Sequence, residues 1–276
     1  MSSALITGAS SGIGRATAER LAAAGWTVWA GVRELADGAA VASGHSTCPR
    51  PRPLELDVAD EASIAGAFAQ IEREGGLDAV VNNAGIGVAG PLELLTSEEL
   101  RRQLEVNVIG QVAVTRAALP LLRRSDDPRI VFVGSVGGRI AFPFAGAYHA
   151  SKFAIEAIGD ALRVELAPEQ IPVSIVEPAA ISTAIWEKAQ AKLAELRGRP
   201  GAERYLDRLD AFSARLQSAD ESGGDPDEVA ATIEKALSEG SPGARYPVGA
   251  SARLVGALKP LIPDPLLDKL TARIAK

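Results

Sequence analysis

The chain has 276 residues, of which 47% are hydrophobic, and its formal net charge is -6 at pH 7. This length fits one large α/β domain and does not require two. The acidic balance argues against the basic face that nucleic-acid binding usually needs, so we expect no nucleic-acid partner. The single cysteine, Cys48, excludes an intrachain disulfide and has no histidine or cysteine at metal-ligand spacing. We therefore predict no metal site and treat Cys48 as incidental.

The first residues, MSSALITGASSG, lack the basic start and the apolar run of a signal peptide. No window approaches the roughly 20 apolar residues that span a bilayer. Together with the cysteine usage, these features predict a cytoplasmic protein.

Short apolar segments alternate with longer amphipathic segments along the chain. Strands are predicted at residues 4–6, 27–31, 54–56, 79–82, 130–133, 173–176 and 245–248. Helices are predicted at residues 12–24, 63–74, 97–122, 147–166 and 226–238. Continuous apolar strands separated by helices indicate a parallel sheet covered on both faces. The prediction is an α/β fold: a single doubly wound, Rossmann-like domain of about seven strands over 1–276, with its ligand at the carboxyl ends of the strands.

Two regions depart from this alternation. Residues 184–224 are polar, charged and helix-prone, which fits a lid over a substrate cleft and equally an ordinary pair of surface helices. The tail at 250–276 is apolar and basic and contains three prolines. We expect the tail to pack on a neighbouring subunit or on the lid, with peripheral membrane contact as the less favoured alternative.

The segment ALITGASSGIGRATAERL combines a strand, a tight turn and a helix. Gly8, Gly12 and Gly14 occupy the turn, where glycine lets the backbone approach a ligand closely. The N-terminus of the helix offers unpaired N–H groups and a positive dipole to a pyrophosphate. The spacing is G-x-x-x-G-x-G rather than the G-x-G-x-x-G of many dinucleotide folds. The place of the glycines between a strand and a helix is therefore what predicts a dinucleotide site.

The end of the second strand, VWAGVRELA, bears on the choice of cofactor. An acidic residue there would bind the ribose 2′-hydroxyl of NAD(H), whereas an arginine accommodates the 2′-phosphate of NADP(H). Arg33 follows Val32 at this point, and a guanidinium is well suited to hold a phosphate. The neighbouring Glu34 weakens the inference, and a merely solvated Arg33 stays open. NADP(H) is preferred, with NAD(H) as the alternative.

In the stretch AYHASKFAIEA, Tyr148 and Lys152 are four residues apart and share one face of a helix. A phenol with its ordinary pKa of about 10 is a poor acid or base near neutral pH. A nearby ammonium lowers that pKa. The pair is therefore either a tuned general acid/base or a helix face without chemistry, and the spacing alone does not choose.

The chain also carries TGASSGIG from residue 7, NNAG from residue 82, and Ser135 after the strand RIVFV. With these motifs and Tyr148-x-x-x-Lys152, it resembles the short-chain dehydrogenases/reductases over about residues 4–185. The likeness is to the compact single-domain branch, and in appearance it is closest to steroid and retinoid dehydrogenase-like members.

The resemblance implies a role for each of four residues. Tyr148 would exchange a proton with the substrate oxygen, and Lys152 would bind the nicotinamide ribose and lower the pKa of the tyrosine. Ser135 would hydrogen-bond the substrate oxygen, and Asn107 would help to hold a water in a proton relay to the lysine. Such chemistry fits carbonyl reduction, in which negative charge develops on the oxygen.

The resemblance further implies a set of cofactor contacts. They are Gly8, Ser10, Ser11, Gly12, Ile13, Gly14, Arg33, Asp57, Val58, Asn83, Ala84, Gly85, Tyr148, Lys152, Pro178, Ile181 and Thr183. The family usually has a glycine where this chain has Ala179, which puts the local backbone near the nicotinamide in question. Many NADP-preferring members have a basic residue where this chain has Ser11, so phosphate selection would rest on Arg33.

The predicted function is an NADP(H)-dependent oxidoreductase that interconverts a ketone or aldehyde with an alcohol. Phe142 and Phe144 lie near Tyr148 in the sequence and favour a hydrophobic small-molecule substrate, and a homodimer or homotetramer is expected. A non-catalytic NADP(H)-binding regulator or scaffold is the alternative, although the four residues are intact. An epimerase or dehydratase of nucleotide sugars is disfavoured because G-x-x-G-x-x-G and a larger substrate domain are missing. A hydrolase built on Ser135 and His149 is disfavoured because VGSVG lacks the G-x-S-x-G elbow.

Overall fold

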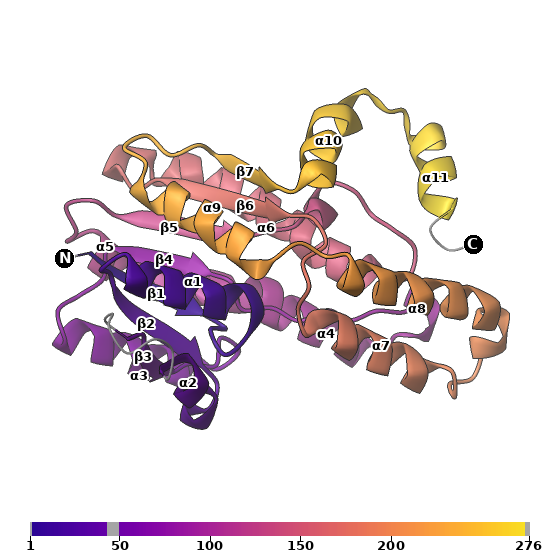
Figure 1. Cartoon of the computed structure of the whole chain (residues 1–276), viewed down its shortest axis with the longest axis horizontal. Coiled ribbons are helices and arrows are strands. Elements are labelled where there is room, and N and C mark those ends of the chain that lie inside the picture. The colour runs from indigo at the N-terminus through magenta and orange to yellow at the C-terminus, as the bar shows by residue number, and fades with distance from the viewer. Residues whose placement is uncertain (1, 43–49, 274–276) are drawn as a thin grey trace.

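The computed structural model describes residues 2–42 and 50–273, and Cys48 lies outside them. A seven-stranded parallel sheet forms its centre in the order β3-β2-β1-β4-β5-β6-β7 (Figure 1). The strands are β1 (Ser3–Thr7), β2 (Thr27–Val32), β3 (Arg52–Glu55), β4 (Ala79–Asn82), β5 (Arg129–Val133), β6 (Val173–Pro178) and β7 (Arg245–Val248). The predicted doubly wound α/β fold is confirmed, and each predicted strand is present.

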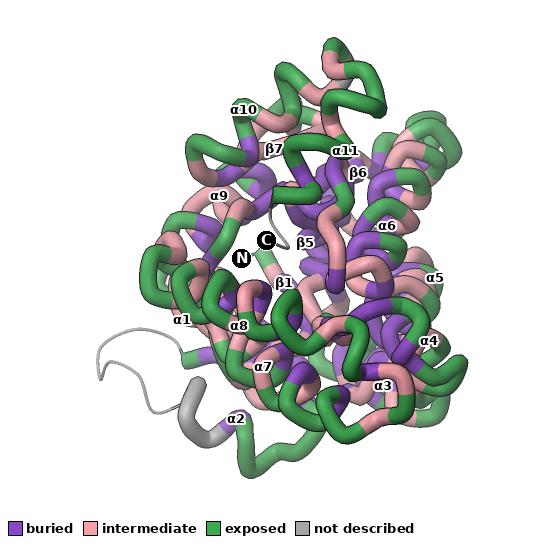
Figure 2. The backbone as a smooth tube through the Cα atoms, turned by 90° about the vertical axis from the view of Figure 1, so that its right-hand side faces the viewer, coloured by how far each residue is buried: buried purple, intermediate pink, exposed green. Residues whose placement is uncertain are grey.

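Helices cover both faces of the sheet because its central strands are apolar on both sides. Apolar residues of α1 (Gly12–Ala23) and α9 (Pro226–Ser238) form one core with one face. Apolar residues of α3 (Glu61–Arg73), α5 (Gly110–Leu122) and α6 (Gly146–Glu165) form a second core with the other face. Figure 2 shows the buried residues gathered between these two helical layers. The sheet is therefore held rigidly, and only its strand ends remain open for a site.

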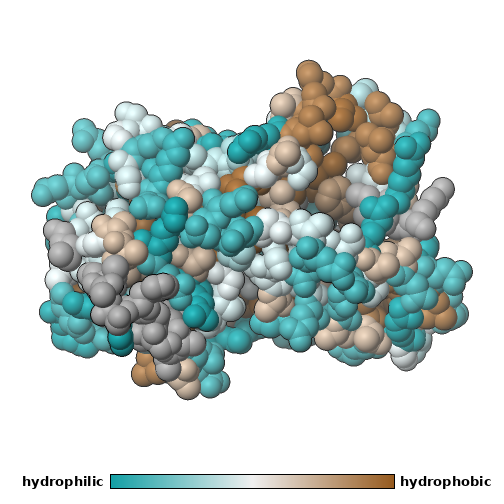
Figure 3. Space-filling view, viewed as in Figure 1, coloured by the Kyte–Doolittle hydropathy of each residue, from teal (hydrophilic) through white to brown (hydrophobic). Residues whose placement is uncertain are grey.

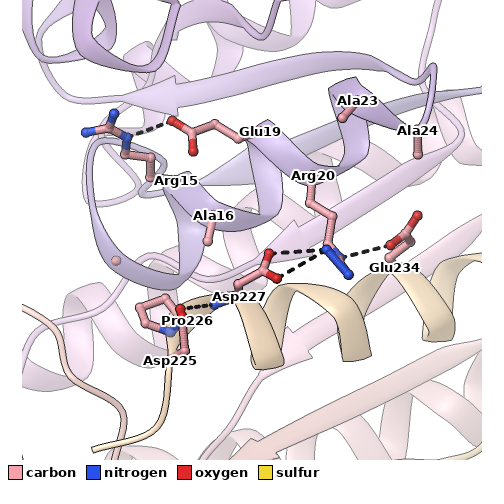
Figure 4. A pocket seen from close by; sticks show the side chains of 11 residues that line it. Arg15, Ala16, Glu19, Arg20, Ala23, Ala24, Asp225, Pro226, Asp227 and Glu234 are labelled. Carbon is pink, nitrogen blue, oxygen red and sulfur yellow. Dashed lines mark hydrogen bonds and ion pairs between the residues drawn. The ribbon is translucent and has the colours of Figure 1, made fainter. Parts of the chain in front are cut away.

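A groove of about 690 Å³ lies between α1 and α9. Arg20 of α1 forms ion pairs there with Asp227 at 3.2 Å and Glu234 at 3.0 Å (Figure 4). Arg15 pairs with Glu19 at 2.8 Å on the same helix. The charges of the groove satisfy one another, and we interpret it as a helix–helix joint.

The predicted helix at 97–122 is interrupted, which corrects the expectation of one continuous element. The chain instead forms α4 (Ser97–Leu104), a π-helical turn (Glu105–Ile109) and α5. Gly110 follows the π turn, and a Cβ atom there would lie 2.5 Å from the carbonyl oxygen of Val58. The close approach explains why the sequence has glycine at this junction. A helix not predicted from the sequence, α2 (Leu35–Ala42), follows β2.

The region after β6 forms a helical hairpin, α7 (Ile185–Leu196) and α8 (Leu206–Glu221), joined through a 3₁₀ turn (Ala202–Arg204). The hairpin forms a third buried apolar cluster, which includes Leu196, Leu209 and Phe212. Glu99 of α4 bonds the guanidinium of Arg199 at 2.6 and 2.8 Å, which fastens the hairpin to the main body.

The tail forms α10 (Ala250–Leu258), a 3₁₀ turn (Lys259–Leu261) and α11 (Asp264–Ala272). Arg215 of α8 donates to the carbonyl of Arg273 at 2.9 Å, so the tail contacts the hairpin. An apolar surface lies over α10 and α11 (Figure 3), with exposed leucines at positions 254, 258, 261, 266 and 270. Among the described residues, no helix has the length and apolar character needed to cross a membrane. Three more 3₁₀ turns lie among the described residues, at Leu92–Leu94, Val136–Gly138 and Ala167–Glu169.

Candidate active site

The carboxyl ends of four neighbouring strands meet at one edge of the sheet. Gly8 follows β1, Asn83 follows β4, Ser135 lies just beyond β5, and Pro178 ends β6. The strand order places these ends side by side. The order in which successive strands are added to the sheet reverses between β1 and β4. Open α/β sheets bind ligands at this location. The predicted site residues, which are scattered in sequence, are thus brought together along one edge.

The glycine loop has the backbone that only glycine adopts easily. Gly8 has φ +66° and Gly12 has φ +54°. A Cβ atom on Gly14 would lie 2.3 Å from the carbonyl oxygen of Gly8. Ser11 is exposed at the N-cap of α1, Ser10 is half-buried, and Ile13 packs against the core behind the loop. The exposed helix N-terminus and the close-packed glycines fit a pyrophosphate.

The segment after β4 is fixed to the glycine loop by hydrogen bonds. The hydroxyl of Thr7 accepts the N–H groups of Asn83 at 3.0 Å and Ala84 at 2.9 Å. The amide of Asn83 donates to the carbonyls of Thr7 at 2.9 Å and Gly8 at 3.2 Å. Thr7 was not predicted as a site residue, although it opens the TGASSGIG motif.

Arg33 leaves the sheet beside this loop. Thr7 pairs with Gly31 in the β1–β2 register, and Arg33 lies exposed two residues further on. On the next connection, the carboxylate of Asp57 accepts the N–H of Ala59 at 2.9 Å. Val58 is buried against the joint with α5. Asp57 and Val58 are thus held in place by contacts within the protein. The side chain of Arg33 is exposed and available to a ligand.

Ser135, Tyr148 and Lys152 converge at the end of β5. The hydroxyl of Ser135 accepts the N–H of Gly137 at 3.0 Å, which orients it in the turn Val136–Gly138. The Nζ of Lys152 donates to the carbonyl of Val133 at 2.7 Å and lies 5.7 Å from the centre of the Tyr148 ring. The turn after β5 and helix α6 therefore hold a hydroxyl, a phenol and an ammonium together.

The acidities of this group differ from the expectation for the tyrosine. Burial raises the pKa of the Tyr148 phenol above its ordinary value, and the hydrogen bond with Ser135 opposes that effect. Burial lowers the pKa of Lys152 to about 8, and the negative charge of Glu156 opposes the lowering. Desolvation is thus the leading influence on the Tyr148 phenol, and a lowering of its pKa by Lys152 stays a prediction. The phenol carries its proton at neutral pH.

A ladder of side-chain amides holds the segment Ala84–Val88 against α4 and α5. The amide of Asn107, in the π turn, accepts the N–H of Ile86 at 2.8 Å and donates to its carbonyl at 2.9 Å. Gln103 accepts the N–H of Val88 at 2.7 Å, and Gln111 donates to the carbonyl of Ala84 at 2.9 Å. The residues at 103, 107 and 111 are spaced by four, and all three are fully buried. The sequence therefore held a signal for Gln103 and Gln111 that our prediction missed.

Asn107 also donates to Ser151 at 3.1 Å, and a Cβ atom on Gly85 would lie 3.4 Å from its Oδ1. The side chain of Asn107 is thus engaged with backbone and Ser151. A role for Asn107 in a proton relay stays a prediction.

The loop after β6 reaches back to the glycine loop. A Cβ atom on Gly12 would lie 3.0 Å from the Cγ2 of Thr183. Ile181 is buried in the core and bridges to Gly224. Ala179 donates its N–H to Val248 at 3.0 Å, and its φ is not positive, so a side chain is tolerated where the family usually has glycine.

Phe144 and Phe142, which lie near Tyr148 in the sequence, both pack against other side chains of the protein. Phe144 is buried, and its ring packs against Tyr205 and Phe212 of the hairpin. His149 is buried, its Nδ1 donates to the carbonyl of Gly137 at 2.9 Å, and Phe142 packs on its ring. Burial lowers the pKa of His149, so it is a neutral structural residue.

Comparison with known proteins agrees with this arrangement. Residues 2–194, more than half of the chain, match the short chain dehydrogenase family. The chain belongs to this family. It is therefore an oxidoreductase that acts on CH–OH groups of small molecules, and the resemblance drawn from the motifs is confirmed.

Several known short-chain dehydrogenases are similar to it. The 3-amino-tetrahydro-pyrrolizinone reductase of Xenorhabdus hominickii is 46% identical over 189 residues, which are 67% of this chain and 64%, less than two thirds, of that reductase. Human 17-beta-hydroxysteroid dehydrogenase type 1 is 36% identical over 88% of this chain and 76% of its own. The NADPH-dependent 3-dehydrocapnine reductase of Ornithobacterium rhinotracheale is 34% identical over 97% and 95%. The crystal structure of a short-chain dehydrogenase from Streptomyces avermitilis matches with a TM-score of 0.78 and 31% identity over 99% and 97%.

Proposed function

We propose that this short-chain dehydrogenase is an NADP(H)-dependent enzyme that interconverts a ketone or aldehyde with an alcohol, with Tyr148 as general acid/base. The observation that carries the proposal is the convergence of Ser135, Tyr148 and Lys152 beside the glycine loop. A donor at the substrate oxygen is what carbonyl reduction requires as negative charge develops there.

The surroundings of Ser135, Tyr148 and Lys152 support a separate role for each residue in the reaction. The bound nicotinamide supplies the hydride in reduction and accepts it in oxidation. Ser135 is oriented by Gly137 and holds the substrate oxygen by its hydroxyl. Tyr148, protonated because burial raises its pKa, gives its proton to that oxygen during reduction. The Nζ of Lys152 lies over the face of the Tyr148 ring, and its positive charge stabilises the phenolate that remains after proton transfer.

The cofactor preference rests on Arg33. Its exposed guanidinium lies beyond β2, and no acidic residue occupies the position that would bind a ribose 2′-hydroxyl. The similarity to an NADPH-dependent reductase over 97% of the chain gives the same direction. We therefore assign NADP(H) as the preferred cofactor and NAD(H) as the weaker one.

A hydrophobic substrate is supported by the walls around Tyr148. A Cβ atom on Gly87 would lie 3.1 Å from the Cγ1 of Ile185, at the start of α7, and 3.9 Å from the Cδ2 of the Tyr148 ring. The indole of Trp186 is anchored to the carbonyl of Ile181 at 2.6 Å. The similarity to a protein named as a 17-beta-hydroxysteroid dehydrogenase supports the same substrate class. In this proposal the α7–α8 hairpin is the lid of the cleft.

Assembly as a homodimer or homotetramer is supported by exposed apolar residues on the long helices. Leu104 and Ile109 are exposed between α4 and α5, and Phe153 and Val164 are exposed on α6. Burial of these side chains by a second copy would remove apolar surface from water. Sedimentation analysis of the wild type against Ile109→Lys tests the assembly, and a monomeric wild type would contradict it.

The function is tested by cofactor binding and turnover. We expect NADPH to bind the purified protein more tightly than NADH, and lipophilic ketones to turn over while small polar sugars do not. Tyr148→Phe is expected to bind NADPH normally and to lose at least about 100-fold in kcat, the usual contribution of a general acid. Tyr246→Phe serves as the matched control, because it removes a phenol on the edge strand β7 that donates to the carboxylate of Glu239 after α9.

The alternative function has its own signature in this experiment. Tight NADPH binding with no turnover of any ketone, aldehyde or alcohol would favour the alternative of a non-catalytic NADP(H)-binding regulator or scaffold. Full activity in Tyr148→Phe would refute the assigned acid.

A further inference from the structure

A buried ionic cluster lies directly behind the catalytic turn. The side chains of Glu156 on α6 and Glu177 on β6 are only 9% and 4% exposed. Arg139, just after the turn, approaches Glu177 to 2.6 Å, and Arg245 of β7 approaches Glu156 to 3.0 Å. Arg245 also reaches Asp160, one turn further along α6, at 2.7 Å. The cluster ties together the three segments that carry Ser135, Lys152 and the loop after β6.

Glu156 and Lys152 lie one turn apart on α6, and both side chains contact the end of β5. The Nζ of Lys152 is bonded to the carbonyl of Val133. The Oε1 of Glu156 has no hydrogen-bond partner, and a Cβ atom on Gly134 would lie 3.0 Å from it. The ammonium and the carboxylate thus lie against consecutive residues at the end of β5. Both residues are almost fully buried, at 5% and 6% exposure, so water screens their charges little.

We propose that Glu156 is a positioning residue that keeps Lys152 positively charged under the catalytic tyrosine. Arg139 and Arg245 complete the arrangement because they keep the buried carboxyl of Glu156 able to ionise. The consequence for turnover rests on the proposed function of Tyr148 and Lys152, whereas the electrostatic coupling itself does not.

The acidities support this arrangement. Burial raises the pKa of Glu156 to about 7, the charge of Glu177 acts in the same direction, and Arg245 and Arg139 oppose them. Burial lowers the pKa of Lys152 to about 8, and Glu156 opposes that lowering. Ionised Glu156 therefore retains the proton of Lys152 in the range where a buried lysine would lose it.

A cavity lies beside the ionic cluster. A cavity of about 410 Å³ is lined by Arg139, Glu156, Asp160 and Arg245, and by Lys259 after α10. The exposed ring of Phe153 stands at its edge, so the cavity meets the protein surface. Lys259 adds a further positive charge to the lining of the same cavity. Glu156 can thus exchange its proton with solvent without passing through the substrate site.

The coupling is tested by titrating Lys152 in the cofactor-free protein by NMR with [13Cε]lysine, its resonance assigned with Lys152→Met. We expect the midpoint of Lys152 to fall by about one pH unit in Glu156→Gln, the lower end of the effect of an adjacent charge. Asp160→Asn is the matched control, because it removes a carboxylate from the same arginine but lies further from Lys152. Equal midpoints in wild type and Glu156→Gln would overturn the proposal.

A second measurement addresses turnover. The alkaline limb of the pH profile of kcat/KM should move to lower pH in Glu156→Gln and stay in place in Asp160→Asn, whereas a merely structural loss would lower the whole profile. If Glu156→Gln does not fold, Arg245→Gln should lower the midpoint of Lys152 in the same direction, and no change there would overturn the proposal. A wild type without turnover would refute the proposed function, while the NMR titration would still decide the coupling.

Discussion

Replacing Gly14 by alanine is the sharpest test of the glycine loop. The added methyl would lie 2.3 Å from the carbonyl oxygen of Gly8 and 2.5 Å from the amide nitrogen of Asn83. Neither atom is the end of a free side chain, since the amide of Asn83 is bonded to Thr7 and Gly8. The loop must therefore move. Overpacking of this kind costs about 1–3 kcal/mol.

A second glycine provides the control. Gly66 lies within α3 and has nothing within 4 Å of the position of an added Cβ. Alanine is favoured over glycine in a helix interior by about 0.5–1 kcal/mol. Gly14→Ala and Gly66→Ala therefore make the same chemical change with opposite expected effects on the free energy of unfolding.

Both variants are measured by thermal unfolding and by NADPH binding. For a chain of this size, 1 kcal/mol moves Tm by about 2–4 °C. We expect Gly14→Ala to lower Tm by about 2–12 °C and to weaken NADPH binding, and Gly66→Ala to raise Tm slightly with unchanged binding. A Gly14→Ala protein with wild-type Tm and wild-type NADPH affinity would refute the interpretation of the loop as a close-packed cofactor cradle.

Three further substitutions follow from named contacts. Arg33→Ala should weaken NADPH binding by about 10- to 100-fold, the loss of a hydrogen bond to a charged group, and leave NADH binding unchanged in calorimetry. Burial raises the pKa of Glu156 in the folded protein from its ordinary 4.5 to about 7, so the wild type loses stability as pH rises between these two values. The free energy of unfolding of Glu156→Gln should therefore increase relative to that of the wild type from about pH 4.5 to about pH 7, and a pH-independent difference would contradict this. Glu99→Gln weakens the bonds to Arg199 and should speed hydrogen exchange in α7, whereas Asp210→Asn, in an exposed pair with Arg197, should not.

The strands were predictable because the sheet is buried on both faces, so each strand is a short apolar run bounded by polar residues. The helix α2 was missed because LADGAAVA contains an aspartate and a glycine and is too short for a clear helical period. The π turn was missed because it lies inside one continuous helical pattern in the sequence. Gly110 meets the carbonyl of Val58, and local sequence does not report that contact.

The site was predictable to the extent that each residue belongs to a motif at a strand end. The order of the strands then brings Gly8, Ser135 and Tyr148 to one edge. The acidity of Tyr148 was not predictable, because it depends on how deeply α6 is buried rather than on the neighbour four residues away. Glu156 was overlooked for the same reason, since a glutamate on an amphipathic helix is ordinarily solvated.

Phe144 joins the catalytic helix to the hairpin and leads to a last prediction. It has φ +65°, which is rare for an aromatic residue, and its ring lies 5.6 Å from Phe212 and 4.9 Å from the guanidinium of Arg208. The left-handed backbone costs roughly 1–2 kcal/mol for a residue with a Cβ, and the packing of the ring offsets that cost. Phe144→Ala loses the ring and keeps the strain, whereas Phe144→Gly loses the ring and relieves the strain.

We therefore expect Phe144→Gly to be more stable than Phe144→Ala by about 1 kcal/mol, the reverse of the usual order of glycine and alanine. Both should be less stable than the wild type by about 3–5 kcal/mol before this relief is counted. Denaturant unfolding of the two variants measures the difference. If Phe144→Ala is the more stable of the two, the left-handed backbone is not under strain. In that case the contacts of the ring with α8 would not be compensating a strained backbone. The position of the segment before Tyr148 would then not depend on α8.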